Sequence, residues 1–306
     1  MAEKKLNTTK AVIDLGTNTF NLLIADVGFD RIDIVLSIQE PVLLGMGGIN
    51  EKRITDEAKQ RATSTLCMFV ALCRHNGVEP DHIQALGTSA IRDAQNQAEF
   101  IREIHSATGL RIEVISGDRE AELISKGVQW IHSFSVPSMI MDIGGGSTEF
   151  IWSGPDGVAA YESLDIGISR IYQALGEPFH YGASAQAFVR NYLEERYTFR
   201  SDQHAEVLIG VSGSFETLWE MIHEQRFPLV GEIQELDITR VLELLEWIIH
   251  SSWIDRKDHL WILPVRRRML PISALKIQWV LNHLKIKRFM VSPYAMKEGA
   301  LAEDVQ

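Results

Sequence analysis

The chain contains 306 residues, 45% of them hydrophobic and 23% charged, and its formal net charge is −11. A chain of that length exceeds one compact core and predicts two domains of about 150 residues each. The acidic balance argues against a general nucleic-acid binder, although an acidic protein can still bind an anionic substrate where the local potential is positive. No apolar run reaches the roughly 18 residues that a membrane span needs, and no signal-peptide pattern precedes the first strand, so we expect a cytoplasmic protein.

The first half of the sequence alternates between segments with the period of strands and segments with the period of helices. Strands are predicted at 10–16, 20–28, 31–38, 83–86 and 111–115, and helices at 54–75, 96–108 and 118–130. The helix at 54–75 is the most clearly delimited, because Asp56 and Glu57 occupy its first turn and Gly77 follows its end. Strands that alternate with helices predict an α/β fold.

The same order of elements restarts in the second half. Strands are predicted at 138–143, 147–153, 157–165, 206–211 and 287–291, and helices at 168–176, 183–198, 214–225, 237–250 and 267–284. A meander of three strands followed by α/β elements thus occurs twice, beginning at Val12 and at Met139. This internal repeat predicts two similar domains, residues 1–128 and 129–306, joined by a tight hinge.

The sequence DIGGGSTEF, at residues 142–150, combines a glycine-rich turn with a carboxylate on each side. Glycine lets the backbone approach a ligand closely, so the N–H groups of the turn could surround a phosphate. Asp142 and Glu149 could lie near one divalent cation, for which Mg²⁺, or Mn²⁺ in its place, is the natural candidate. The predicted phosphate contacts are Gly144, Gly145, Gly146, Ser147 and Thr148. A plain glycine-rich hairpin is the alternative, but the flanking carboxylates and a second, similar loop favour a phosphate site.

That second loop, DLGTNTFNLL at residues 14–23, occurs at the same point of the first domain. The side chains of Thr17, Asn18 and Thr19 could contact phosphate oxygens, and Asp14 could hold a divalent cation through water. An Asx-type turn that only closes the hairpin explains the same residues equally well. The pair of loops suggests a phosphate clamped between two similar domains.

Two further segments follow predicted strands, where α/β proteins place ligand-facing residues. In GTSAIRDAQN, Arg92 could clamp a phosphate through two hydrogen bonds, or could simply pair with Asp93 on the surface. In VISGDREAEL, Glu120 lies in the first turn of a helix and could accept a proton from an attacking water. The alternative for Glu120 is that it and its acidic neighbours stabilise the helix dipole.

The second domain offers two more candidate anion contacts. In GVSGSFETL a glycine–serine turn starts a helix, so the N–H groups of Gly213 and Ser214 could bind a phosphate, or a serine could merely cap the helix. The cluster of Arg266, Arg267 and Arg268 is the main exception to the acidic composition. Such clusters are most often solvated surface, and a polyanion groove is the minority interpretation.

Together these motifs resemble the exopolyphosphatase/guanosine-pentaphosphate phosphatase (Ppx/GppA) family of the actin–hexokinase–heat-shock superfamily. The resemblance covers nearly the whole chain, in the segments AVIDLGTNTFNLLIADV, LGTSAIRDAQN, VISGDREAELISKGV, MIMDIGGGSTEFIW, SLDIGISRI and VSPYAMKEGALAE. It implies two ribonuclease-H-like domains with the active site in a cleft between them. It also implies release of a terminal phosphate from polyphosphate, or conversion of pppGpp to ppGpp.

The resemblance implies a role for each candidate residue. Glu120 matches the carboxylate that activates water, and Arg92 matches an active-site arginine. Asp142 and Glu149 match acidic residues around the divalent cation, and Asp14 matches the carboxylate of the first phosphate loop. The two turns match the phosphate-binding loops of the family.

The chain departs from the family pattern at several positions. Asn21 stands where a His or Arg is common, and Ala295 and Lys297 replace the Gly and Arg of a GLREG ending. A lysine keeps the charge but loses the bidentate geometry of arginine. Arg266 and Arg267 fall where the family carries a Pro-x-x-Arg pattern, so contact with a polyanion and support of the fold are both open. Long members continue into an extra helical domain, and we therefore expect a short, two-domain form with less grip on long polymers.

The sequence thus predicts a Mg²⁺-dependent phosphoanhydride hydrolase that acts on polyphosphate or pppGpp, as a homodimer without nucleic-acid or membrane partners. Two other classes of function remain open. A sugar or acid kinase of the same superfamily would share both loops, but its catalytic aspartate and adenosine motif are not evident. A non-catalytic sensor of ppGpp or polyphosphate fits the departures at Asn21, Ala295 and Lys297, whereas the presence of Glu120 argues for catalysis.

Overall fold

The computed structural model describes residues 8–28, 31–200 and 203–303. These residues form two compact units. Unit 1 contains the described residues up to Trp130 together with those from Tyr294 onward, and unit 2 contains Ile131–Pro293.

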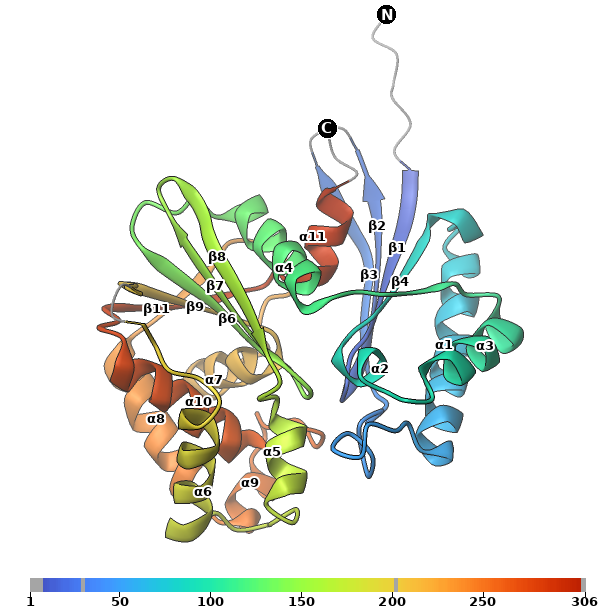
Figure 1. Cartoon of the computed structure of the whole chain (residues 1–306). Helices are drawn as coiled ribbons and strands as arrows, with labels where there is room; N and C mark the ends of the chain where they lie inside the picture. Colours follow the sequence, from blue (N-terminus) through green and yellow to red (C-terminus); the bar gives the residue numbers. More distant parts are fainter. Residues whose placement is uncertain (1–7, 29–30, 201–202, 304–306) are drawn as a thin grey trace, which may run out of the picture. The chain divides into compact units, whose positions relative to one another are not determined.

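Unit 1 is built on a five-stranded mixed sheet (Figure 1). Its strands are β1 (Thr8–Leu15), β2 (Thr19–Val27), β3 (Ile32–Pro41), β4 (Ile83–Gly87) and β5 (Ile112–Val114), in the order β3-β2-β1-β4-β5. β1, β2 and β3 form an antiparallel meander, while β4 is parallel to β1 and β5 is parallel to β4. The carboxyl ends of β1, β4 and β5 therefore lie at one edge of the sheet, where the candidate site residues follow them.

Helices pack on both faces of this sheet (Figure 1). They are α1 (Asp56–His75), α2 (Ser89–Arg92), α3 (Gln97–Thr108), α4 (Gly117–Ile131) and α11 (Met296–Ala302), with a 3₁₀ turn at Pro80–His82. Thr55 caps the start of α1, because its side chain accepts a hydrogen bond from the Ala58 N–H. α1 packs with α3 against β1, β2 and β4. α11 packs on β1 and β2.

Unit 2 repeats this design with a six-stranded sheet. Its strands are β6 (Ser138–Ile143), β7 (Thr148–Gly154), β8 (Gly157–Leu164), β9 (Val207–Val211), β10 (Gln234–Leu236) and β11 (Arg288–Ser292), in the order β10-β11-β9-β6-β7-β8. β6, β7 and β8 form an antiparallel meander, and β6, β9 and β11 are parallel. Each unit therefore has the ribonuclease-H-like arrangement, and the predicted α/β fold class is confirmed.

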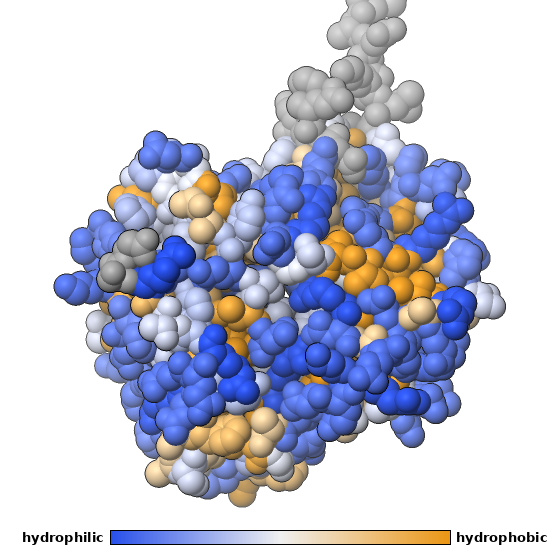
Figure 2. All heavy atoms as spheres, in the orientation of Figure 1, coloured by the Kyte–Doolittle hydropathy of each residue, from blue (hydrophilic) through white to orange (hydrophobic). Residues whose placement is uncertain are grey.

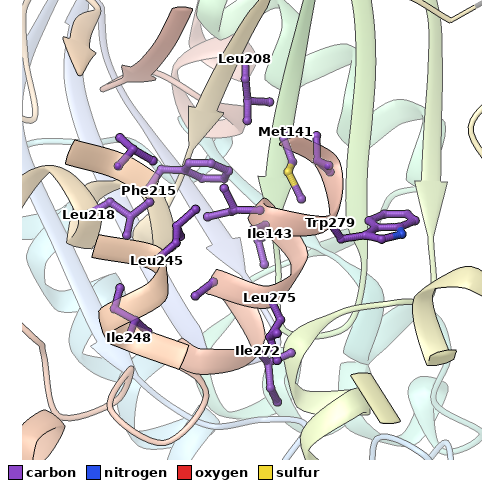
Figure 3. Close-up of a cluster of buried hydrophobic side chains, with 14 of the residues drawn as sticks. Met141, Ile143, Leu208, Phe215, Leu218, Leu245, Ile248, Ile272, Leu275 and Trp279 are labelled. Atoms are coloured by element: carbon purple, nitrogen blue, oxygen red, sulfur yellow. The ribbon is translucent and has the colours of Figure 1, made fainter. Parts of the chain in front are cut away.

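The main core of unit 2 forms between this sheet and its helices. These are α5 (Ile168–Ala174), α6 (Ala183–Glu194), α7 (Gly213–His223), α8 (Ile238–His250), α9 (Trp253–Asp258) and α10 (Leu270–His283). Met141 and Ile143 of β6 meet Phe215 of α7 and Leu275 of α10 in this core (Figure 3). The apolar faces of β6 and α10 thus fix the position of the loop that follows β6.

The C-terminal segment lies in unit 1, which differs from the predicted division of the chain. Residues from Tyr294 onward belong to unit 1, whereas the prediction placed them in the second domain. α11 and α4 approach so closely that a Cβ on Gly299 would lie 1.8 Å from a backbone oxygen of α4. Glu303, just beyond α11, also pairs with Arg119 and Lys126 of α4. These contacts, rather than any local pattern, return the end of the chain to unit 1.

Hydrophilic residues cover most of the face shown in Figure 2. Most of the large apolar side chains that are exposed belong to unit 2, among them Phe179, Ile254 and Leu260. Within the described ranges, none of the helices combines the length and the apolar character that a membrane crossing needs.

Candidate active site

The two predicted loops lie at equivalent places in the two sheets. Loop 1 (residues 16–18) joins β1 to β2, and loop 2 (residues 144–147) joins β6 to β7. In the first hairpin Asp14 pairs directly with Asn21, and in the second Asp142 pairs with Glu149. Residues that face each other across two strands lie on the same side of the sheet. Each loop is therefore accompanied by two polar side chains, an acid and an amide in unit 1 and two acids in unit 2.

Loop 2 turns its carbonyl groups toward the start of α5. The carbonyl oxygens of residues 144–146 accept hydrogen bonds of 2.8 to 3.2 Å from the backbone N–H groups of residues 167–169. Arg170 Nε donates a further bond of 2.7 Å to the Gly146 carbonyl oxygen. Because the C=O and N–H of a trans peptide point in opposite directions, the N–H groups that follow these carbonyls point away from α5. Successive N–H groups on one side of a turn suit an anion.

Gly167 makes this close docking possible. A Cβ at this position would lie 2.3 Å from the Gly145 carbonyl oxygen, well inside van der Waals contact. The segment SLDIGISRI was part of the family resemblance, but none of its residues was given a role. In the structure it holds loop 2 in place.

Each of the two acids that flank loop 2 is bound by a serine hydroxyl. Ser212 Oγ donates to Asp142 Oδ2 at 3.0 Å, and Ser163 Oγ donates to Glu149 Oε1 at 2.7 Å. Glu149 is only 1% exposed. Ser212 has a φ of 68° and a ψ of −179°, a conformation that costs a residue with a Cβ on the order of 1–3 kcal/mol. The hydroxyl therefore reaches Asp142 at the expense of backbone strain.

The pair Asp142 and Glu149 suits a cation that is shared with a phosphate. Mg²⁺ prefers oxygen ligands and is commonly bound by one or two carboxylates together with substrate phosphates. No cluster of three or more acidic, histidine or cysteine side chains that could hold a metal is found in the part of the chain that the structure describes. The residues therefore fit a cation bound together with its phosphate and do not fit a cage made of protein alone. Asp14, the third predicted ligand, belongs to unit 1.

Loop 1 is anchored in the same way, by the segment after β3. The carbonyl oxygens of Asn18 and Thr17 accept hydrogen bonds of 2.8 and 3.0 Å from the N–H groups of Leu43 and Gly45. The Thr17 side chain is buried, and its methyl group packs against Gly45. Asn18 and Thr19 are half-buried and stand at the turn itself. Of the three predicted phosphate contacts in loop 1, Thr17 thus serves the packing of the loop.

Asp14 is bound by an amide instead of a second acid. Its Oδ2 accepts a hydrogen bond of 2.9 Å from Asn21 Nδ2, and Asn21 Oδ1 accepts one of 3.0 Å from Gln39. Burial raises the pKa of the Asp14 carboxyl to about 6, although Lys297 and Asn21 lower it. Asn21 is therefore the partner of Asp14, and Lys297 of α11 supplies positive charge near this acid.

The two predicted catalytic residues lie together in unit 1. Arg92, at the end of α2, donates from Nη1 to Glu120 Oε2 at 3.1 Å and to the Ile115 carbonyl oxygen at 3.0 Å. Both side chains are mostly buried, with exposures of 20% for Arg92 and 12% for Glu120. Arg92 thus holds Glu120 at the start of α4, next to the strand end that precedes it.

Two of the predicted phosphate contacts in unit 2 turn their hydroxyl groups inward. The Thr148 hydroxyl accepts a hydrogen bond from Lys276 and donates one of 3.0 Å to the Ser147 carbonyl oxygen. The hydroxyl groups of Ser214 and Ser273 are 2.9 Å apart and share a hydrogen bond. A contact of Thr148 or Ser214 with a phosphate therefore has to come from the backbone N–H, and the hydroxyl groups stabilise the interior.

The arginine cluster supports the start of α7. Arg266 donates to Glu216 Oε2 at 2.9 Å and to Thr217 Oγ1 at 2.8 Å. Its guanidinium lies so close to Gly213 that a Cβ there would be 2.4 Å away. Arg267 donates to a backbone carbonyl of the preceding turn. These contacts favour support of the fold over an open polyanion groove, and they cover one side of Gly213.

Four residues that contact the site were missed in the sequence. Ser212 binds Asp142 and Ser163 binds Glu149, while Arg170 binds loop 2 and Lys276 binds Thr148. Lys276 left a signal, because it is the only charged residue in the helical segment Leu270–His283, which is otherwise largely apolar. Ser212, Ser163 and Arg170 left none beyond their place in motifs that were already noted.

Comparison with known proteins agrees with this architecture. The Ppx/GppA phosphatase family matches residues 23–306. The chain belongs to this family. The match begins within β2 and includes Arg92, Glu120 and both acids of loop 2.

Several relatives of this Ppx/GppA family member are known. Its structure is similar to the crystal structure of an exopolyphosphatase from Cytophaga hutchinsonii, with a TM-score of 0.91, 32% identity, and coverage of 98% of this chain and 99% of that one. It is 33% identical to a bifunctional 3-dehydroquinate synthase/phosphatase of Fusobacterium nucleatum, over 99% of this chain and 47% of that protein. It is 25% identical to a guanosine-5'-triphosphate,3'-diphosphate pyrophosphatase of Aeromonas salmonicida, over 95% of this chain and 58% of that protein. The chain thus spans about half the length of the curated relatives it matches.

Proposed function

We propose that the chain is a Mg²⁺-dependent phosphoanhydride hydrolase that releases the terminal phosphate of inorganic polyphosphate. The observation that carries this proposal is loop 2, whose carbonyl groups are bound by the start of α5 and which lies between the acids Asp142 and Glu149. Similarity to an exopolyphosphatase over nearly the full length supports polyphosphate as the first substrate to test. pppGpp presents the same terminal phosphoanhydride and is the second.

Each group in the proposed reaction has one task. Loop 2 binds and orients the terminal phosphate through its N–H groups, because phosphoryl transfer depends chiefly on positioning and on stabilising charge. Asp142 and Glu149 would hold Mg²⁺, or Mn²⁺ in its place, and the bound cation would neutralise negative charge on the phosphate oxygens. Glu120 accepts a proton from the attacking water, whose oxygen forms the new bond to phosphorus while the bond to the remaining chain breaks.

Arg92 connects the state of Glu120 to the presence of substrate. A guanidinium binds phosphate as readily as carboxylate. In the structure the Arg92 guanidinium is bound to Glu120 Oε2. In the proposed reaction a phosphate oxygen competes for Arg92, and this competition frees a Glu120 oxygen to take the proton from water.

The test is phosphate release from long polyphosphate, from tripolyphosphate and from pppGpp, each measured with Mg²⁺ and with a chelator. We expect cation-dependent release from at least one of the three. Glu120→Gln should keep substrate binding and lower turnover by about 10²–10⁴-fold. Glu122→Gln is the matched control on the same helix, because Glu122 is paired with Arg119 and Lys126, and it should turn over like the wild type.

Other outcomes identify the remaining classes of function. Binding of polyphosphate or pppGpp without release from any substrate would favour the non-catalytic sensor, and phosphate transfer to a hydroxyl acceptor would favour a kinase. Normal turnover by Glu120→Gln would remove Glu120 as the base. The homodimer and the cytoplasmic location remain predictions, to be checked by sedimentation and by cell fractionation.

A further inference from the structure

Lys276 is a fully buried lysine in the middle of α10. Its exposure is 0%, and it is among the largest side chains that are wholly enclosed. Its neighbours Ile272, Leu275 and Trp279 on the same helix lie in the apolar core of unit 2 (Figure 3). An ammonium group inside such a core is unfavourable unless it is well bound. Its position therefore calls for a physical reason.

Lys276 contacts both the strand that follows loop 2 and the segment that supports the loop. Its Nζ donates to the Thr148 hydroxyl, in the first residue of β7 after the loop. It also donates to the Ile166 carbonyl oxygen at 2.6 Å. Ile166 immediately precedes Gly167, whose N–H binds the Gly146 carbonyl oxygen at 3.2 Å. One ammonium group thus joins the strand that leaves loop 2 to the segment on which the loop rests.

The charge of Lys276 also acts on the two acids. Burial lowers the pKa of the ammonium to about 7, while the negative charges of Glu149 and Asp142 raise it. A second cation, Arg170, is 6% exposed and binds the carbonyl side of the loop. Loop 2 is therefore held by two buried basic side chains and flanked by two acids.

We propose that Lys276 is a positioning residue of loop 2, which keeps the loop in its phosphate-binding shape and offsets the charge of Asp142 and Glu149 so that a polyanion can approach. This inference rests on the proposed function, because it assumes that loop 2 binds phosphate. Lys276 does not touch the substrate in this proposal. It acts through Thr148, through Ile166 and through its charge.

The positive charge of Lys276 should have opposite effects on the binding of a divalent cation and of a polyanion. Removal of the positive charge of Lys276 should tighten the binding of a divalent cation by about tenfold and weaken the binding of tripolyphosphate by about tenfold. The ammonium group repels the cation and attracts the polyanion through a medium of low effective dielectric constant. A residue that only supports the fold would weaken both when it is removed. The sign of the change in cation affinity therefore separates the two explanations.

The experiment is calorimetric titration of the full chain with Mn²⁺ alone and with tripolyphosphate in the presence of Mg²⁺. Lys276→Met removes the charge and the hydrogen bonds, and Lys276→Gln removes the charge but keeps a donor for Thr148 or Ile166. We expect tighter Mn²⁺ binding in both, and a larger loss of tripolyphosphate binding in Lys276→Met. If Lys276→Met does not fold, Lys276→Gln carries the test.

Lys59→Met is the matched control. Lys59 is a 7% exposed lysine of unit 1 that is bound by Glu99 and Glu103, so its loss changes the stability and should leave both titrations as in the wild type. Unchanged affinities in the Lys276 variants, or a parallel loss of both ligands, would overturn the inference while the proposed function stands. A wild type that neither binds tripolyphosphate nor releases phosphate would overturn both.

Discussion

The two hairpins have the same frame and differ in the side chain that faces the acid. In both, an acid is the next-to-last residue of the first strand, and the loop carbonyls are bound by the segment after the third strand. The residue that faces the acid is Asn21 in unit 1 and Glu149 in unit 2. Two facing acids repel each other and are stabilised by a cation, whereas an acid bound by an amide is satisfied without one. The facing acids make unit 2 the better candidate for the proposed cation.

The surroundings of Asp14 and Asp142 also differ between the two units. Burial raises the pKa of Asp14 to about 6, so that this carboxyl is held in a site that disfavours its charge. Asp142 accepts a hydrogen bond from Ser212, and its charge acts on the buried ammonium of Lys276. A site that places two acids beside a glycine loop is suited to a cation and its phosphate. The following predictions test how far this difference holds.

Glu149→Gln gives loop 2 the acid–amide pair of loop 1. We expect turnover at saturating Mg²⁺ to fall by about 10²–10³-fold, which is the usual effect of removing one stabiliser of transition-state charge. The dependence of the rate on Mg²⁺ concentration should be lost as well. Phosphate release measured across a Mg²⁺ titration reports both effects.

Asn21→Ala is the matched control at the same place in loop 1. It removes the amide that donates to Asp14 and should lower turnover by less than about tenfold, the effect of one hydrogen bond worth about 1 kcal/mol. Its response to Mg²⁺ should stay that of the wild type. Equal losses in the two variants would mean that both hairpins serve the cation, and the comparison would fail.

Asp14→Asn tests the acid beside loop 1 through the pH dependence of stability. Burial raises the pKa of this carboxyl from 3.8 to about 6 in the folded state. The raised pKa means that its stabilising contribution is complete below pH 3.8 and is lost as the pH rises through about 6. With a chelator present, the variant should therefore be more stable than the wild type by up to about 3 kcal/mol above that pH, and the gain should vanish in acid.

Denaturant unfolding at a series of pH values measures this gain. Asp33→Asn, at an exposed position of β3, is the control and should stay within about 0.5 kcal/mol of the wild type at every pH. A gain that is constant across the series would show that the charge of Asp14 is not its cause. Loop 1 would then resemble loop 2 more closely than the structure indicates.

Most of the fold could be predicted because its strands and long helices carry their own periodic patterns. The meander with an acid at the end of its first strand occurs twice in the sequence, so both sheets were predicted up to the edge strand β10. The elements that were not predicted are short, namely α2, α9, β10 and α11. The place of α11 depends on the close contact of Gly127 with Gly299, and a contact between such distant residues leaves no local pattern.

The candidate site could be predicted where it lies within one hairpin. Asp142 and Glu149 belong to one motif, and strand alternation places both on the same face. Ser212 and Lys276 reach the same loop from β9 and α10, and the sequence does not specify which residue of a distant turn or helix will meet an acid. The roles of Glu120 and Arg92 came from the family resemblance, and their contact with each other came from the structure.

Gly167→Ala and Gly45→Ala test whether the two loops are equally rigid. A Cβ on Gly167 would meet the backbone of loop 2, with Gly145 O 2.3 Å away, whereas a Cβ on Gly45 would meet the Thr17 methyl group at 2.6 Å. Backbone yields less than a side-chain tip, so Gly167→Ala should lower the free energy of unfolding by about 2 kcal/mol and Gly45→Ala by about 1 kcal/mol.

The same two variants should differ in ligand binding. Gly167→Ala should weaken tripolyphosphate binding by about tenfold, because a shifted loop misplaces its N–H groups, and Gly45→Ala should leave it within about threefold. Chemical denaturation and calorimetric titration measure the two quantities. A larger loss of binding in Gly45→Ala would assign the main phosphate contact to loop 1 instead.

Ser212→Gly and Ser212→Ala separate the backbone strain beside loop 2 from the hydrogen bond that accompanies it. The residue in the corresponding place of unit 1, one beyond the strand partner of Asp14, is Gly87, whereas in unit 2 it is Ser212 with a φ of 68°. Both variants remove the hydroxyl that binds Asp142. Only glycine also relieves the backbone, so Ser212→Gly should be more stable than Ser212→Ala by about 1 kcal/mol.

Both variants should weaken Mn²⁺ binding by the same factor, up to about tenfold, because an outer hydrogen bond orients the acid that binds the cation. Thermal unfolding and calorimetric titration measure the two effects separately. If Ser212→Gly binds the cation like the wild type and Ser212→Ala does not, then the backbone and not the hydroxyl shapes the site. Equal weakening of Mn²⁺ binding with unequal stability would show that unit 2 tolerates backbone strain at Ser212 in order to hold Asp142. Unit 1 has no need of such strain, because it has Gly87 at the corresponding place and an amide partner for Asp14.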